Sequence, residues 1–350
     1  MSDPSPRPHC GHRDIAKQAG FSSATVSLAL SHHPRISEAT RKKIEKVAKE
    51  LGYTPNAELA HVMKVTQKRK PGKPVIALLT NQTEASPWKT HVYFKRFHDT
   101  VTERASDLGY RIEEFWLKEP GMTAKRLSQI LHARGTAGLI IPPAFAAGKR
   151  LPFKVDGLAV GVHGRVFWKP HLHRVQADHL FNTMLALKEI LKLGYSRIGI
   201  ATFYGTDKAH GHEIESAYAY YHSRQLMPTF IPPFHSDEMD VEGFWKWHEQ
   251  HRPDVILSSF PGILECLRHQ GIRVPEDVGF ACLGVIPELG DIAGIDINAE
   301  STDRALVDVV VAQIVAGERG IPKVPRATLV EGFWKTGGTL RKQSRGTNPG

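Results

Sequence analysis

The chain has 350 residues, of which 41% are hydrophobic and 23% charged, a composition typical of a globular protein with a sizeable core. Its formal net charge at pH 7 is +10. Residues 1–73 carry most of this charge, with 14 Lys and Arg against 6 Asp and Glu, whereas the rest of the chain holds 32 and 30. A basic terminal segment on a nearly neutral body favours a polyanionic partner.

The cysteines are Cys10, Cys266 and Cys282, too few and too scattered for a disulfide framework, so a reducing cytoplasm is expected. Residues 1–12 are Pro-rich and polar, lack the apolar run of a secretory signal, and are predicted to be a disordered tail. No apolar run reaches the length of a transmembrane helix, so no membrane partner is expected.

The stretch RDIAKQAGFSSATVSLALS, residues 13–31, predicts two short helices joined by a sharp turn. Ile15, Ala16 and Ala19 form an apolar edge on the first helix. Gly20 suits a left-handed residue after that helix, and Ser22 can cap the next one. An ordinary helical hairpin inside a core is the alternative interpretation.

The second helix has an outer face without acidic side chains. If Val26 and Leu30 are its buried edge, the 3.6-residue period places four residues opposite: Ala24, Ser27, Leu28 and Ser31. Such a face can enter the major groove of DNA, because nothing on it repels phosphate.

A third helix is predicted from a cap at Ser37 to Gly52, with a buried stripe of four residues: Ile44, Val47, Ala48 and Leu51. Arg35 lies in the turn before it, where it can contact a phosphate. A short helical candidate, AELAHVMK, and the basic linker TQKRKPGKP follow Asn56.

The segments DIAKQAG, S-x-x-TVS and RISEATRKKI…LGYTPN together resemble the headpiece of the lactose-repressor (LacI) family of bacterial transcriptional regulators. The resemblance implies a helix-turn-helix DNA-binding headpiece over residues 13–55 and a hinge helix with its linker over residues 56–73. In that family the outward positions of the second helix read the major groove, and here these are Ser23, Ala24 and Leu28.

The resemblance also implies further contacts with DNA. Thr25, Ser27, Ser31 and Arg35 fall near the phosphate backbone, and Ser22 completes the predicted set in the headpiece. Asn56 begins the hinge helix, and an apolar hinge residue wedges into the minor groove. That wedge is Val62 or Met63, with Leu59 as an alternative.

One reading position departs from the family. Leu28 occupies a place where the family commonly has Arg, so a guanine-reading contact is missing. Together with Ala24, Leu28 favours apolar contact with thymine methyl groups.

From Val75 onward strands and helices alternate, beginning with the strands VIALLT, RIEEFWL and AGLIIPP. A second series starts near Gln176 and includes RIGIATF, PDVILSS and DVGFACLG. This pattern predicts an α/β fold of two lobes with parallel sheets and a cleft between them. The resemblance implies a periplasmic-binding-protein-like effector-binding and dimerisation core over residues 74–335, followed by a disordered tail over residues 336–350.

The predicted cleft lacks the polar groups of sugar- and purine-responsive relatives. Glu213 falls on the position of their Arg, Phe260 and Pro261 replace an Asn-Asp pair, Gly284 replaces an Asp, and Ile297 replaces a Gln. A polar ligand would then leave buried groups unpaired. We therefore expect no simple sugar or anionic purine as effector. The ligand is more apolar or aromatic and stacks on Phe260, or the core mainly dimerises.

Asn81 and Trp88, which follow the first strand, are predicted at the mouth of the same cleft. The histidine pairs His171/His173, His210/His212 and His248/His251 join no Cys or carboxylate in a known ligand spacing, so neither a metal nor a cofactor is expected. The tail residues His9, Cys10 and His12 lack a fourth ligand. No nucleophile elbow, P-loop or Rossmann fingerprint is present, so an enzyme is not expected.

The sequence therefore predicts a cytoplasmic transcriptional regulator, expected to be a repressor, that binds a palindromic operator as a homodimer. A small molecule in the cleft would shift lobe closure and thereby DNA affinity. Two alternatives are a solute-binding protein for transport, which would need a signal peptide and no basic headpiece, and a nucleoid-binding protein without sequence preference.

Overall fold

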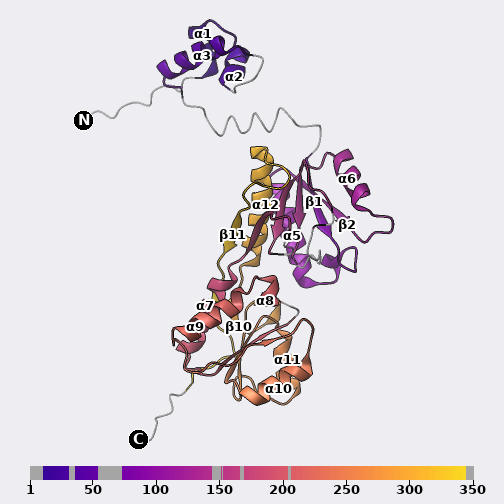
Figure 1. Cartoon of the computed structure of the whole chain (residues 1–350), viewed down its shortest axis with the longest axis vertical. Coiled ribbons are helices and arrows are strands. Elements are labelled where there is room, and N and C mark those ends of the chain that lie inside the picture. Colours follow the sequence, from indigo (N-terminus) through magenta and orange to yellow (C-terminus); the bar gives the residue numbers. More distant parts are fainter. Residues whose placement is uncertain are drawn as a thin grey trace, which may run out of the picture. The chain divides into compact units, whose positions relative to one another are not determined.

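The computed structural model describes residues 11–30, 36–53, 73–143, 151, 153–165, 169–203 and 206–343. The chain divides into two compact units, Met1–Arg69 and Lys70–Gly350, called the headpiece and the core below (Figure 1). Among the helices that the structure describes, none is both long and apolar enough to span a membrane.

The headpiece packs three helices: α1 (His12–Ala19), α2 (Ser23–Leu30) and α3 (Glu38–Glu50). They share a small apolar core, whose fully buried members are Ile15, Ala16, Ala19, Val26, Ala29, Ile44 and Ala48. The first helix begins at His12, within the predicted tail, and the imidazole Nε2 of His12 lies 2.8 Å from the hydroxyl oxygen of Tyr53. This contact extends the ordered unit at both ends.

The predicted turn and caps are confirmed. Gly20 has φ 75°, and its N–H donates to the carbonyl of Ala16 at the end of α1. The Oγ atoms of Ser22 and Ser37 accept from the amides of residues 25 and 40, at 3.0 and 3.3 Å. One detail differs: Val26 and Ala29 are the fully buried pair of α2, whereas Leu30 is only partly buried. In a helix this short, residues three positions apart already define the buried edge.

The first lobe of the core is a six-stranded sheet in the order β11-β5-β4-β3-β1-β2, with every pairing parallel. Its strands are β1 (Val75–Thr80), β2 (Arg111–Trp116), β3 (Gly138–Ile141), β4 (Ala159–His163), β5 (His173–Ala177) and β11 (Ala327–Val330). Its helices are η1 (Pro87–Lys89), α5 (Val92–Asp107), α6 (Ala124–Ala133) and α12 (Ala299–Ala316). All six residues of β1 are buried, as its continuous apolar sequence predicts.

The second lobe is another six-stranded sheet, in the order β12-β10-β9-β8-β6-β7. Its strands are β6 (Ile198–Thr202), β7 (Phe234–His235), β8 (Val255–Ser258), β9 (Gly279–Cys282), β10 (Ala293–Asp296) and β12 (Phe333–Lys335). The helices are α7 (His179–Lys192), α8 (Thr206–Ala209), α9 (Glu213–Ser223), α10 (Val241–His251), α11 (Gly262–His269) and η2 (Pro287–Leu289). The edge strand β12 is antiparallel to β10, so this sheet is not entirely parallel.

The lobes do not simply follow one another in sequence. After β10 of the second lobe, α12 returns to pack on β3, β4 and β5, and β11 joins the first sheet before β12 rejoins the second. The chain therefore passes between the two sheets three times within the described residues (Figure 1). Helical periodicity reports that α12 has a buried face but cannot report which sheet covers it.

The ordered chain also extends beyond the predicted core. Of the predicted disordered tail, residues 336–343 are described and 344–350 lie outside the described residues. Thr339 is 2% exposed, and its Oγ1 donates to the carbonyl of Phe280 and accepts from the amide of Ala293. The hydroxyl thus satisfies one backbone group of β9 and one of β10, which the polar composition of this segment did not indicate.

We predict that Gly294→Ala destabilises the core by about 3 kcal/mol. Gly294 has φ 150°, and a Cβ there would lie 2.0 Å from the carbonyl oxygen of Cys282, on the neighbouring strand. Chemical unfolding measures the change. Gly284→Ala is the control and should shift stability by less than about 0.5 kcal/mol, because nothing lies within 4 Å of its Cβ position. Equal effects of the two substitutions would contradict the prediction.

Candidate functional site

The outer face of α2 is uncharged and accessible. Ser22, Ser23 and Ala24 are exposed, and the remaining predicted contact residues, Thr25, Ser27 and Leu28, are partly exposed. The helix contains no acidic or basic residue. Its opposite edge is locked into the headpiece core, so this face is held on a rigid element.

The start of α2 is organised by two hydroxyl groups. The Oγ of Ser22 accepts from the amide of Thr25 and also hydrogen-bonds its side-chain Oγ1, at 2.8 Å. These groups lie at the N-terminus of α2, where backbone N–H groups favour a phosphate oxygen. The predicted contacts Ser31, Arg35, Asn56, Val62 and Met63, and the alternative wedge Leu59, lie outside the described residues and stay predictions.

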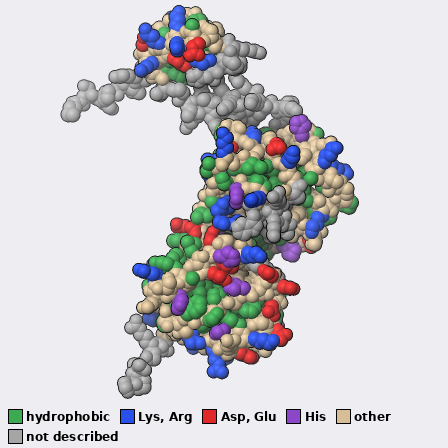
Figure 2. All heavy atoms as spheres, viewed as in Figure 1, with side chains coloured by type: hydrophobic (Ala, Val, Ile, Leu, Met, Phe, Trp, Pro, Cys, Tyr) green, Lys and Arg blue, Asp and Glu red, His purple; other side chains and the backbone are tan. Residues whose placement is uncertain are grey.

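Basic side chains lie on other parts of the headpiece. On α3, Arg41 and Lys42 lie 4.0 and 3.9 Å from Glu38, and the ammonium group of Lys43 lies 5.3 Å from the centre of the Phe21 ring. Figure 2 shows Lys and Arg on the visible face of the headpiece, together with a smaller acidic area. Basic side chains of this kind suit phosphate contacts, which set the position of a protein on DNA.

In the core, Glu213 at the start of α9 meets two residues of the first lobe. Its carboxylate oxygens accept from Nε2 of Gln176 at 3.2 and 3.4 Å, and one of them lies 3.9 Å from Arg165. Burial raises the pKa of the Glu213 carboxyl, while Arg165 opposes the rise. Glu213 thus lies between the lobes and is bound to protein groups, and its role in effector binding stays a prediction.

Two basic residues near Glu213 were not anticipated. Arg174 on β5 lies 3.2 Å from Gln176, and burial followed by the charge of Arg165 lowers the pKa of its guanidinium. Positive charge is therefore present beside Glu213, but it comes from the first lobe. The sequence gives only a weak signal for the position of these two arginines, because the boundaries of β4 and β5 are not evident from the residue pattern.

Histidines line another part of the boundary between the lobes. The rings of His179, at the start of α7, and His210, after α8, stack with centroids 3.5 Å apart and planes within 7°. Burial is the main cause that lowers the pKa of both, to about 4 for His210. Both rings are therefore neutral at pH 7, and the Nδ1 of His210 has no hydrogen-bond partner among the described residues. Figure 2 shows several histidines on the second lobe near this boundary.

First-lobe groups complete this histidine-lined boundary. His163, at the end of β4, lies 3.4 Å from the carboxylate of Asp303 on α12. Burial raises the pKa of Asp303, which His163 partly offsets, and burial also raises the pKa of Tyr93 on α5. A second contact between the lobes joins Arg96 on α5 to both carboxylate oxygens of Glu288 in η2, at 3.0 Å each.

The other predicted effector residues are spread over both lobes. Phe260 follows β8 and packs on Phe203, 6.0 Å between ring centres, and Ile297 packs against the second-lobe core. Both side chains therefore contribute to packing within their lobe. The predicted position Gly284 follows β9 and has open space where a side chain would lie.

The two predicted residues of the first lobe lie after β1. Asn81 is partly buried directly beyond the strand, and Trp88 stacks on His98 with ring centres 4.9 Å apart. Trp88 also lines a small apolar cavity with residues of β1 and α5, including Leu78, Phe94 and Phe97. This arrangement supports an aromatic surface at the end of the first sheet.

Comparison with known proteins covers both units. Residues 13–56 match the family model of bacterial regulatory proteins, lacI family. DegA of Bacillus subtilis, an HTH-type transcriptional regulator, is 34% identical over 99 residues, which are 28% of this chain and 26% of DegA. The chain thus spans about a quarter of DegA. MalR of Streptococcus pneumoniae, another such regulator, is 24% identical over 318 residues, 85% of this chain and 90% of MalR.

The fold resembles a solved regulator along most of the chain. The crystal structure of the Lac repressor dimer bound to operator and the anti-inducer ONPF aligns with a TM-score of 0.55 and 16% identity, and it covers 95% of this chain and 99% of the other. The likeness extends over the N-terminal helices and the two-lobed core.

We predict that His210 makes the core less stable in acid. Its pKa is about 4 in the folded chain and about 6.5 when unfolded, so the unfolded state binds more protons between these values. The stability contribution is complete above pH 6.5 and is lost as the pH falls toward 4. Relative to His210→Phe, which keeps a stacked ring without a titrating group, the wild-type core should lose on the order of 1 kcal/mol between pH 7 and 5. Parallel pH dependence in urea unfolding of both proteins would contradict this.

Proposed function

We propose that the chain belongs to the lacI family of bacterial regulatory proteins, whose model residues 13–56 match, and that it is a sequence-specific DNA-binding regulator that represses transcription from its operator. The observation that carries the proposal is the outer face of α2, which is exposed, uncharged and fixed by the headpiece core. The proposed place of action is the cytoplasm, where operator DNA is accessible.

In the proposed complex α2 lies in the major groove. Ser23, Ala24 and Leu28 face base edges, with the methyl and isobutyl groups of Ala24 and Leu28 against thymine methyls. Ser22 and Thr25, at the N-terminus of the helix, contact a phosphate and set the register. The predicted hinge contact of Val62 or Met63 with the minor groove belongs to the same proposal.

We further propose that the chain acts as a homodimer. One headpiece of three short helices contacts too few base pairs for specificity in a genome, whereas two headpieces related by a two-fold axis read a palindrome. The similar solved structure is described as a Lac repressor dimer bound to operator, which supports this arrangement by analogy.

The core is proposed to respond to a small molecule held between its lobes. The contacts of Glu213 with Gln176 and Arg165 join the lobes, so a ligand that separates or replaces them changes lobe closure. A solved relative is a transcriptional regulator in complex with cellobiose. For this chain we propose a more apolar or aromatic effector, because Glu213 is already bonded to protein groups and the stacked neutral rings of His179 and His210 offer a flat π surface.

Selection of bound genomic fragments should return one palindromic motif for the wild-type chain. Leu28→Arg is expected to change the preferred base at one position of each half-site toward guanine, because Arg can bond O6 and N7 of guanine. Its affinity for the wild-type motif should fall about tenfold or more. Gln18→Arg adds the same charge on the exposed side of α1 and should leave the motif unchanged. An unaltered motif for Leu28→Arg would refute the assignment of α2.

Operator affinity should decrease steeply with salt, since binding releases counterions from each neutralised phosphate. A plot of log Kd against log salt concentration between about 50 and 200 mM should be linear with a slope of several units. Fluorescence anisotropy with labelled operator measures it. A flat response would exclude the proposed phosphate contacts.

Calorimetric titration of the full chain with common monosaccharides and disaccharides is expected to show no micromolar binding, because the predicted polar groups for sugar hydroxyls are replaced. Glu213→Gln serves as the companion variant, since it retains a side chain of the same size without the charge. Micromolar sugar binding that weakens in Glu213→Gln would overturn the proposed effector class.

A further inference from the structure

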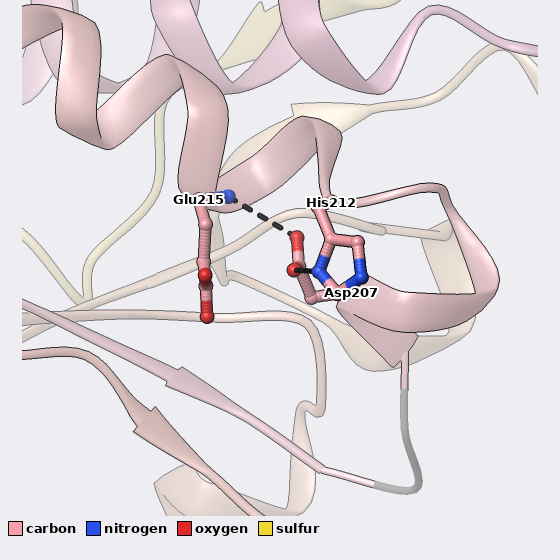
Figure 3. Close-up of side chains that lie close together, drawn as sticks. All are labelled: Asp207, His212 and Glu215. Atoms are coloured by element: carbon pink, nitrogen blue, oxygen red, sulfur yellow. Dashed lines mark hydrogen bonds and ion pairs between the residues drawn. The ribbon is translucent and has the colours of Figure 1, made fainter.

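Three potential metal ligands meet in the second lobe, on α8, on the turn that follows it and on the first turn of α9. Asp207, His212 and Glu215 each offer one ligand atom, and these atoms lie within 4.8 Å of one another (Figure 3). In the sequence, no carboxylate stands in a known ligand spacing with His212. The structure differs because α8 and the turn after it fold back, which brings Asp207 beside His212.

The carboxylate of Asp207 is buried and rigidly oriented. Its Oδ1 accepts from the amides of Ile214 and Glu215, each at 3.1 Å, at the start of α9. Its Oδ2 lies 2.9 Å from Nδ1 of His212 (Figure 3). Metal-bound carboxylates are commonly held by hydrogen bonds of this kind on the other oxygen.

Asp207 and His212 are close enough to share an ion after a small separation. Their contacting atoms are 2.9 Å apart, a hydrogen-bond distance, whereas two tetrahedral ligands about 2.1 Å from one Zn²⁺ lie about 3.4 Å apart. Glu215, in the first turn of α9, is the third member of the group. Its side chain lies on the side of α9 that faces Asp207 and His212 (Figure 3).

A fourth residue holds Glu215 in place. The Nε2 of His235 on β7 forms a close ion pair with Oε1 of Glu215. The Nδ1 of His235 lies 2.7 Å from the hydroxyl of Thr202, which is buried at the end of β6. The imidazole is therefore oriented by the neighbouring strand, and it orients the carboxylate in turn.

Helix capping does not by itself account for this arrangement. The two amide hydrogen bonds of α9 end on Oδ1 of Asp207 alone. Its second oxygen, the imidazole of His212 and the carboxylate of Glu215 are not needed for that cap. His212 also adopts φ 65°, a conformation that glycine favours, while its ring faces Asp207.

We propose that Asp207, His212 and Glu215 bind one divalent transition-metal ion of the Zn²⁺ class, with His235 as a positioning residue for Glu215. The imidazole donor favours such ions over Mg²⁺ and Ca²⁺, which prefer oxygen ligands. Three protein ligands leave a further coordination position for water.

The test is calorimetric titration of the metal-depleted full chain with Zn²⁺. We expect the wild type to bind one equivalent of Zn²⁺. This binding should be lost in His212→Gly, and the affinity for Zn²⁺ should fall more than about 100-fold in Glu215→Gln. Glycine suits the backbone at residue 212, so the fold should persist. The matched control is His222→Ala, an exposed histidine on α9 that contacts Phe230, and it should bind like the wild type.

Two further measurements separate loss of binding from loss of fold. Zn²⁺ should raise the Tm of the wild type and of His222→Ala but not of His212→Gly, and excess Mg²⁺ should not displace Zn²⁺. Micromolar binding of equal stoichiometry and affinity in all variants would place the ion elsewhere, such as at His9 and Cys10, and would overturn the proposal. Absence of micromolar binding in the wild type would also overturn it. Neither result bears on operator recognition.

Discussion

The close packing of α12 on the first sheet is the contact on which the core depends. Leu306, Val307 and Val310 of this helix are fully buried. A Cβ at Gly138 or Gly161 would lie 2.6 Å from Val310, so glycine on β3 and β4 is what permits this approach. The chain reaches α12 directly from β10 of the second lobe. Burial of α12 against the first sheet therefore connects the two lobes.

Polar groups make the same contact specific. The side-chain amide of Gln313, 3% exposed, accepts from the backbone N–H of Val160 and donates to its carbonyl, at 3.1 and 3.0 Å. A buried amide is stable only where both its donor and acceptor are satisfied. These two hydrogen bonds form only at one position of α12 along its axis. Apolar packing alone would allow the helix to shift more freely along the sheet.

The boundary between the lobes has a different character from their interiors. Its contacts are ion pairs, amide bonds and imidazole rings, as in Arg96 with Glu288 and Glu213 with Gln176. Such groups retain favourable interactions with water when they separate, so the cost of opening is smaller than for an apolar core. This property suits the proposed response to a ligand, while the headpiece keeps α2, the proposed DNA-reading helix, on a separate small core.

The sequence by itself determined the elements whose causes are local. The turn at Gly20, the caps at Ser22 and Ser37 and the buried strand β1 depend on residues a few positions apart, so periodicity and residue type were sufficient. Tertiary structure alone decided which sheet receives α12, where Thr339 is buried, and that Asp207 and Arg165 lie beside their partners. Those outcomes depend on contacts between distant segments, because a pattern of burial indicates that a residue is covered but not by what.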